Sequence, residues 1–300
     1  MPLKLSIITI NLNNAEGLRK TMESVLSQTS NDFEYIVIDG GSNDGSKEII
    51  LDFANQKAKK FGNKQFTWIS EPDKGIFHAM NKGIQIAIGE FCQFLNSGDF
   101  LHTTEIVEKM LSSLPDCSIY YGNMLKLLPK GKIYRDTCGK GKITMFSFYR
   151  GTLNHSPALI KRCLYEKYGL YDENLKIVSD WKWYLISIGL HNEPVQYINL
   201  DVTCFNMDGI SNKYPELEKQ ERRKVISEMI PACILADYDE HWQKIDQIIR
   251  IHRYKITKWA VWFMDRVLFK FEKIESSLKN NTNLCRSQNN KKINVITNNK

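Results

Sequence analysis

The first hundred residues alternate short apolar runs with amphipathic segments, and this order is what most restricts the fold. Apolar residues at helical spacing, as in 18–26 and 76–88, separate four runs with the length and composition of buried strands. These runs are Leu5–Ile10, Tyr35–Ile38, Phe66–Ile69 and a run from Phe91 that ends at Asp99. Strands that alternate with helices in this way form a mostly parallel, doubly wound α/β sheet.

An aspartate follows three of these four strands. Asp39 ends the second strand, Asp73 follows the third, and Asp99 closes the turn Asn96-Ser97-Gly98-Asp99 after the fourth. Aspartate is common in turns, so one such residue alone would mean little. The ends of successive parallel strands lie side by side, however, at the edge where open α/β sheets bind ligands. We therefore expect the three aspartates to line one pocket, in which Asp99 can hold a cation that neutralises a phosphate.

Composition and loop sequences argue against several other classes of protein. The seven cysteines are scattered without C-x-x-C spacing, so they indicate neither a zinc site nor disulfides, and reduced thiols favour a cytoplasmic location. The first apolar run is too short for a signal-peptide core, and no stretch reaches the roughly 18 apolar residues of a spanning helix. The loop Asn11–Asn14 lacks the glycine pattern of a dinucleotide-binding dehydrogenase.

The net charge of +7 comes from the C-terminal part of the chain. Residues 213–300 hold 18 Lys and Arg against 11 Asp and Glu, whereas residues 1–212 are neutral. A nucleic-acid partner is therefore not indicated, and the basic region needs a local explanation.

Residues 256–274 supply one such explanation. An apolar stripe at helical spacing lies opposite Lys and Arg, with Trp259 and Trp262 near one boundary. The stripe consists of Ile256, Ala260, Phe263, Met264, Val267, Leu268, Phe271 and Ile274. This pattern is typical of a helix in a membrane interface, although the same face could instead pack on the rest of the chain or on another subunit.

The region between these two parts is less regular. We expect a strand at 118–121, a hairpin over 125–135 around Pro129-Lys130-Gly131, and a helix that opens at Ser179-Asp180-Trp181. The last residues, 279–300, are rich in Asn and Lys, which predicts a tail without fixed structure.

Several motifs follow one another in a characteristic order over residues 3 to about 212. They are Ile8–Asn11 with Asn13, Val37–Ser46, Glu71–Ile76 continuing into Ala79–Gly83, Phe94–Asp99, and Ser179–Trp181. In combination they resemble family-2 glycosyltransferases of the GT-A fold, a Rossmann-like mostly parallel sheet. The similarity is greatest to the branch that builds bacterial capsule, exopolysaccharide or lipopolysaccharide. It implies a catalytic domain at 1–212, divided into a nucleotide-binding half at 1–100 and an acceptor-binding half at 101–212. A basic helical extension at 213–278 would follow.

The resemblance also implies an activity and roles for particular residues. The enzyme would move a sugar, with inversion, from a nucleotide diphosphate to a hydroxyl of a glycan or lipid-linked acceptor. UDP is favoured over GDP or dTDP, and an acceptor on a lipid would suit a peripheral position on the inner face of the plasma membrane. Asp99 would bind Mg²⁺ or Mn²⁺, Asp180 would be the general base, and His155 would lie on the acceptor side. The remaining donor contacts would come from Thr9, Asn11, Asp39, Asp73, Lys74, Asn96 and Gly98, and a lid from Gly209, Ile210 and Ser211.

Other interpretations of these residues stay open. Asp180 could cap its helix, His155 could be a structural histidine, and Lys74 could be a solvated surface residue. Asn96 and Gly98 stand where relatives often have carboxylates, and His78 stands where they often have Asp. Two other functions also remain: a sugar-phosphate nucleotidyltransferase, which the loop after the first strand does not favour, or a non-catalytic nucleotide-sugar-binding scaffold. The sequence fixes neither the sugar nor the oligomeric state.

Overall fold

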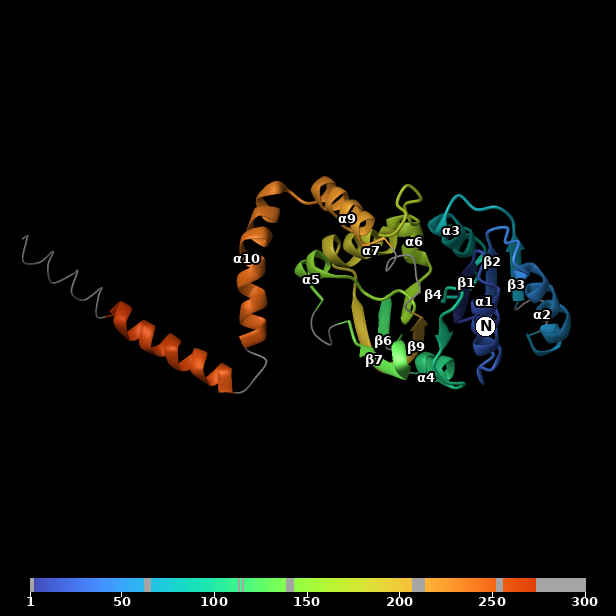
Figure 1. Cartoon of the computed structure of the whole chain (residues 1–300), viewed down its shortest axis with the longest axis horizontal. Helices are drawn as coiled ribbons and strands as arrows, with labels where there is room; N and C mark the ends of the chain where they lie inside the picture. The colour runs from blue at the N-terminus through green and yellow to red at the C-terminus, as the bar shows by residue number, and fades with distance from the viewer. Residues whose placement is uncertain are drawn as a thin grey trace, which may run out of the picture. The chain divides into compact units, whose positions relative to one another are not determined.

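The computed structural model describes residues 3–61, 66–112, 114, 116–138, 143–206, 214–251 and 256–273. The chain divides into two compact units, Met1–Ile230 and Pro231–Lys300. The sheet and the candidate site belong to the first unit, and the second unit contains the C-terminal helices (Figure 1).

The N-terminal half of the sheet is parallel, as the alternating pattern predicts. Its strands run in the order β3-β2-β1-β4, and each pairs in parallel with its neighbour. The strands are β1 (Leu5–Asn11), β2 (Phe33–Asp39), β3 (Phe66–Ser70) and β4 (Phe91–Phe94). The helices between them are α1 (Ala15–Leu26), α2 (Ser46–Phe61) and α3 (Ile76–Ile86). β4 ends at Phe94, and Asp99 lies in the turn that follows it, as the sequence predicts.

The second half of the sheet is mixed. It continues from β4 in the order β8-β6-β9-β5, with β7 paired to β6; the β6–β9 pair is parallel and the others are antiparallel. The strands are β5 (Phe100–Leu101), β6 (Ile119–Leu128), β7 (Lys132–Asp136), β8 (Ala158–Lys161) and β9 (Val195–Asn206). The predicted hairpin is confirmed, because β6 and β7 flank a short 3-10 turn, Pro129–Gly131.

Short helices and one longer helix complete the first unit. They are α4 (Ile106–Ser112), α5 (Met145–Arg150), α6 (Cys163–Tyr168), α7 (Ser179–Tyr184), the π-helical turn Leu185–Leu190 and α9 (Pro215–Met229). The π turn continues directly from α7, so the helix predicted to open at Ser179-Asp180-Trp181 exists but changes its hydrogen-bond pattern after Tyr184.

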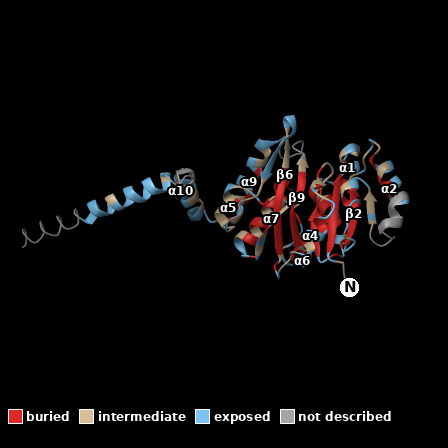
Figure 2. Ribbon diagram, turned by 90° about the horizontal axis from the view of Figure 1, so that it is seen from below, coloured by how far each residue is buried: buried red, intermediate tan, exposed pale blue. Residues whose placement is uncertain are grey.

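The core lies on both faces of the sheet, as the buried strands in Figure 2 show. Every residue of β1 and β2 is buried, which explains why these strands are rich in apolar residues. Gly83 lets α3 approach β1 closely, because a Cβ at this position would lie 2.5 Å from Cγ2 of Ile8. The central strands are therefore fixed on both sides, and the loops at their carboxyl ends have a rigid base.

The second unit is helical where it is described. It contains α10 (Ala232–Ile251) and a helix over 256–273, which confirms helical structure for the predicted amphipathic segment up to residue 273. Large apolar side chains on this second helix, such as Trp259, Phe263 and Leu268, are at least half exposed. No helix among the described residues is both long enough and apolar enough to cross a membrane. The predicted tail at 279–300 lies outside the described residues.

Candidate active site

Asp39 ends β2 as a completely buried carboxylate that is held by hydrogen bonds. Its Oδ1 accepts from Nδ2 of Asn11 at 2.8 Å and its Oδ2 from Oγ of Ser70 at 2.8 Å, and the Ser42 backbone and hydroxyl also donate to it. Burial alone would raise the pKa of Asp39, but the hydrogen bonds from Ser42, Asn11 and Ser70 outweigh it and lower that pKa. Asp39 is therefore a fixed anion that can accept a hydrogen bond from a ligand.

Asp73 lies against the turn that follows Asp39. A Cβ on Gly40 would come 3.2 Å from Oδ2 of Asp73, so the first two predicted aspartates share one edge of the sheet. The other carboxylate oxygen of Asp73, Oδ1, lies 2.6 Å from Nζ of Lys82 and 3.1 Å from Nδ1 of His78. Lys74, in the same loop, is exposed. In this chain, His78 thus stabilises the Asp73 carboxylate, whereas an Asp at position 78 would repel it.

The loop between β4 and β5 brings Asp99 to the same edge. Oγ1 of Thr21 in α1 donates to the Asp99 carbonyl at 2.6 Å and accepts from the Gly98 N–H at 2.9 Å. Gly98 has φ of 103°, a conformation that favours glycine. Thr9 is completely buried and supports this loop from β1, since its hydroxyl donates to the Leu95 carbonyl. The tight turn leaves Asp99 buried, with a relative exposure of 5%.

The residues at this loop fit a cation that is held mainly by a substrate. Among the described residues, no group of three His, Cys, Asp or Glu side chains is arranged to hold a metal ion. Mg²⁺, however, is commonly held by one or two carboxylates together with substrate phosphates, and Asp99 supplies one such carboxylate. Asp99 could therefore supply one ligand to a cation that a phosphorylated ligand also holds.

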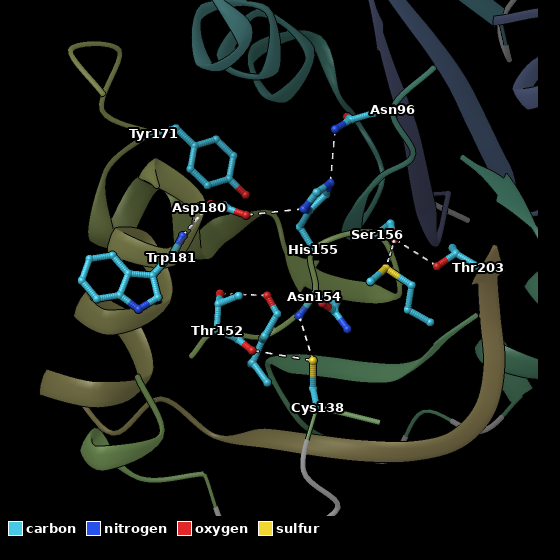
Figure 3. A network of polar contacts seen from close by, with 12 residues as sticks. Asn96, Cys138, Thr152, Asn154, His155, Ser156, Tyr171, Asp180, Trp181 and Thr203 are labelled. Atoms are coloured by element: carbon cyan, nitrogen blue, oxygen red, sulfur yellow. Dashed lines mark hydrogen bonds and ion pairs between the residues drawn. The ribbon is translucent and has the colours of Figure 1, made fainter. Parts of the chain in front are cut away.

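His155 connects this loop to Asp180, as Figure 3 shows. Its Nε2 lies 3.2 Å from Nδ2 of Asn96, and its Nδ1 lies 3.4 Å from Oδ2 of Asp180. Burial lowers the pKa of His155, but the Asp180 and Asp99 carboxylates outweigh burial and raise it above its usual value. His155, which precedes β8, therefore links Asp180 of α7 to the loop that carries Asp99.

Asp180 does not cap its helix. The N-cap residue of α7 is Val178, and Asp180 lies in the first turn, where its Oδ1 accepts from the backbone N–H of Trp181 at 2.8 Å. The side chain is 17% exposed and points toward His155 (Figure 3). Asp180 is therefore not the N-cap residue of α7, although its Oδ1 still accepts from an N–H of the first turn, and its Oδ2 is directed toward His155.

Asn96, His155 and Asp180 all line a cavity of about 260 Å³. Its lining combines apolar and aromatic side chains with these three polar groups and with the charged residues Lys126, Lys176, Glu218 and Arg222. The apolar part includes Ile76, Phe77, Met80, Met124, Leu153, Val178, Trp181 and Phe205. Such a cavity, apolar with a few convergent polar groups, is typical of a ligand site.

Two residues of α9 shape this cavity and were missed by the sequence interpretation. The Glu221 carboxylate accepts from the backbone N–H groups of Lys176, Ile177 and Val178 at 2.7–3.2 Å, just before α7. The Arg222 guanidinium lies 4.6 Å from the Trp181 ring centroid. Both residues lie in a strongly polar helix outside every motif, so no sequence signal distinguishes them from surface charges. The predicted lid residues Gly209, Ile210 and Ser211 lie outside the described residues.

Comparisons with known proteins place part of the chain in a known family. The sequence pattern of Glycosyl transferase family 2 matches residues 6–149, which include Asp39, Asp73 and Asp99. A relative from Mycobacterium bovis, named PGL/p-HBAD biosynthesis glycosyltransferase, is 26% identical over 225 residues, which cover 72% of this chain and 82% of the relative. Residues 6–149 therefore form a glycosyl transferase family 2 domain. The chain is a glycosyltransferase that uses a nucleotide-sugar donor.

Solved structures show that this family 2 glycosyltransferase has the GT-A fold. The structure of S. aureus TarS 1–349 in complex with UDP matches with a TM-score of 0.56 at 14% identity, over 86% of this chain and 78% of TarS 1–349. A mannosyltransferase from Pyrobaculum calidifontis in complex with GDP-Man and Mn²⁺ matches with a TM-score of 0.57 at 15% identity, over 76% of this chain and 64% of that protein. The predicted fold class is confirmed. The family match ends before His155 and Asp180, whose roles therefore depend on the geometry described above.

Proposed function

We propose that the enzyme transfers a sugar, with inversion, from a UDP-sugar to an acceptor hydroxyl, and that Asp180 is its general base. The observation that carries this proposal is the link from Asn96 through His155 to Asp180 at the edge of one cavity. Inversion requires a base on the side of the sugar opposite the leaving diphosphate. Asp180 belongs to α7 and Asp99 to the β4–β5 loop, so the proposed base and the proposed cation ligand come from separate segments.

The nucleoside would occupy the edge formed by β1, β2 and the Gly40-Gly41 turn. The Asp39 carboxylate accepts hydrogen bonds, which suits the N–H group of uracil, and Oδ1 of Asn11 is buried without a hydrogen-bond partner among the described residues. The mannosyltransferase structure contains GDP-Man and the TarS structure contains UDP. The family resemblance favours UDP for this chain.

Asp99 would hold Mg²⁺ or Mn²⁺, and the bound cation would supply the positive charge that stabilises the leaving diphosphate. The chain's own residues would do the rest. Asp180 would accept the proton of the attacking hydroxyl, and the apolar wall around Trp181 would exclude water from the reacting groups.

The proposal is tested with a panel of nucleotide sugars. Purified protein is heated with UDP-, GDP- and dTDP-sugars, each with Mn²⁺ and with EDTA. We expect a rise in melting temperature that is largest for one UDP-sugar and requires Mn²⁺, because a ligand that binds the native state stabilises it. A larger rise with GDP-sugars, or an equal rise in EDTA, contradicts the nucleotide or the metal assignment, respectively.

The acceptor side of the proposal concerns surface glycans. We propose that the acceptor is a glycan or lipid-linked molecule of surface polysaccharide synthesis, and that the enzyme works at the inner face of the plasma membrane. The exposed apolar side chains of helix 256–273, interspersed with Lys258, Arg266, Lys270 and Lys273, support a contact with an anionic membrane surface. This contact is a proposal about the second unit alone.

Flotation on anionic liposomes tests the membrane contact. The full chain should float with vesicles that contain phosphatidylglycerol, and the double variant Phe263→Asp and Leu268→Asp should remain at the bottom, because charge on this face opposes its burial in lipid. Equal flotation of both proteins would reject the proposal.

The two other functions considered from the sequence are not favoured. Membership of a glycosyltransferase family argues against nucleotidyl transfer onto a sugar phosphate. A non-catalytic scaffold would be favoured if Asp180 lay far from the donor loop. The His155 side chain, however, contacts both Asp180 and Asn96 of that loop.

A further inference from the structure

Three side chains from separate segments form a continuous polar chain through the site. Asn96 follows β4, His155 precedes β8, and Asp180 lies in α7 (Figure 3). We propose that His155 is a positioning residue, which orients the Asp180 carboxylate through Nδ1 and is itself oriented by Asn96 through Nε2. The inference builds on the proposed function, since it takes Asp180 as the base.

The contact between Asn96 and Nε2 of His155 determines whether the other ring nitrogen, Nδ1, carries a proton toward Asp180. When the Asn96 amide nitrogen donates to Nε2, a neutral ring carries its only proton on Nδ1, the atom directed at Asp180. When the ring is charged, the amide can turn and offer Oδ1, a buried atom that has no hydrogen-bond partner among the described residues. In both protonation states, the Nδ1–H group is directed at Asp180.

The Asp180 carboxylate is then restrained at both oxygens. The Trp181 N–H fixes Oδ1 at 2.8 Å, and His155 lies 3.4 Å from Oδ2. An oxygen accepts more than one hydrogen bond, so Oδ2 retains capacity for an acceptor hydroxyl. Orientation of this kind matters because a misplacement of about 1 Å at a reacting group can reduce the rate by about a hundredfold.

The step that His155 would support is a balanced transfer. The oxygen of a hydroxyl or of water forms a bond to the anomeric carbon, and the bond from that carbon to the diphosphate oxygen breaks. UDP leaves with the electron pair, and the attacking hydroxyl gives its proton to Asp180. His155 does not enter this balance, because it neither receives nor loses a proton.

Two substitutions separate the two nitrogens of His155. In His155→Asn, the amide nitrogen takes the place of Nδ1 and can still donate to Asp180. In His155→Gln, the amide nitrogen takes the place of Nε2, so the contact with Asn96 can remain while the contact with Asp180 is lost. Turnover is measured as UDP release to water with UDP-glucose, UDP-galactose and UDP-N-acetylglucosamine, using the sugar that the wild-type enzyme hydrolyses fastest.

We expect kcat of His155→Gln to fall by about 10- to 100-fold while its KM for the UDP-sugar stays within about twofold. His155→Asn should keep kcat within about threefold of wild type. Equal losses in both variants, or no loss in His155→Gln, would overturn the positioning role. A loss confined to KM would also overturn it, because it would assign His155 to donor binding.

A parallel measurement separates this inference from the proposed function. If Asp180→Asn retains turnover, the proposed base is wrong, whatever the histidine variants do. If Asp180→Asn is inactive while the two histidine variants behave alike, only the positioning role fails. Thermal unfolding of every variant identifies losses that come from misfolding. If His155→Gln is misfolded, His155→Asn carries the test, because it keeps a donor toward Asp180, and a fall in its kcat of more than about threefold would overturn the positioning role.

Discussion

Nδ1 of His155 lies 3.4 Å from Oδ2 of Asp180, although the two residues come from separate segments that no motif joins. The contact places the proposed base next to the loop that carries Asn96 and Asp99. The two proposed tasks of the site, donor binding and proton removal, then fall to different parts of the fold. The parallel half of the sheet carries the proposed donor edge, and α7, which α9 supports, carries the proposed base.

Removal of the base should separate transfer from donor binding. Asp180→Asn preserves shape and can still accept from the Trp181 N–H, but an amide cannot take up a proton. We expect UDP release to fall by about 10²- to 10⁴-fold, with donor affinity within about threefold of wild type in calorimetry. Asp172→Asn is the matched control, since Asp172 pairs with Lys182 of α7 and does not line the cavity. Near-normal turnover in Asp180→Asn would count against the assignment.

Removal of the proposed cation ligand should affect only metal-dependent binding. Asp99→Ala takes away a buried carboxylate of the donor loop, so UDP affinity in Mn²⁺ should fall by at least about tenfold. UDP affinity in EDTA should change little, because Asp39 and Asn11 remain. Isothermal titration of both proteins with UDP, with and without Mn²⁺, measures the difference. Unchanged Mn²⁺-dependent affinity would remove Asp99 from the metal site.

The ionisation of His155 should depend on Asp180. Its pKa is raised above the usual 6.5 because Asp180 and Asp99 together outweigh the opposing effect of burial. In Asp180→Asn the larger of the two carboxylate contributions disappears, so we expect the pKa of His155 to fall. NMR titration of the imidazole C–H signals measures both values. An unchanged pKa in the variant would show that the two side chains are not coupled in solution.

The same shift predicts a pH-dependent stability difference. A histidine whose pKa is raised in the folded state stabilises that state fully below its unfolded pKa, about 6.5, and less as pH rises through the folded pKa. The free energy of unfolding of wild type relative to Asp180→Asn should therefore be largest below about pH 6.5 and decrease at higher pH. Urea unfolding at several pH values tests the direction, and a difference that grows with pH would contradict it.

Glu221 should be required for the segment before α7. Its carboxylate accepts from three consecutive backbone N–H groups, at Lys176, Ile177 and Val178, and is 9% exposed. Glu221→Ala leaves these donors without their partner, so we expect a loss of about 1–3 kcal/mol in unfolding free energy and a lower kcat. Glu216→Gln on the exposed face of the same helix should change stability by less than about 0.5 kcal/mol. A similar small change in both variants would show that Glu221 does not support the site.

Much of the donor edge could be predicted because it depends on local patterns. Buried runs such as Leu5–Ile10 and the aspartate at the end of β2 are visible in the sequence, and the parallel order of β2 and β1 then brings Asp39 to the predicted edge. Thr9 shows where such reasoning stops. It lies within a motif, yet its side chain is buried and hydrogen-bonded to the Leu95 carbonyl, so its motif position did not reveal its contacts.

The sequence by itself determined the order of strands and helices, the loops that carry the three aspartates and the amphipathic helix near the C-terminus. These follow from hydrophobic periodicity and turn residues, which act over a few neighbouring positions. Only the tertiary structure decided that Asn96, His155 and Asp180 form one polar chain and that Glu221 supports it from α9. Such contacts join distant segments within about 3.5 Å, a distance that depends on how the helices pack on the sheet and that local patterns do not encode.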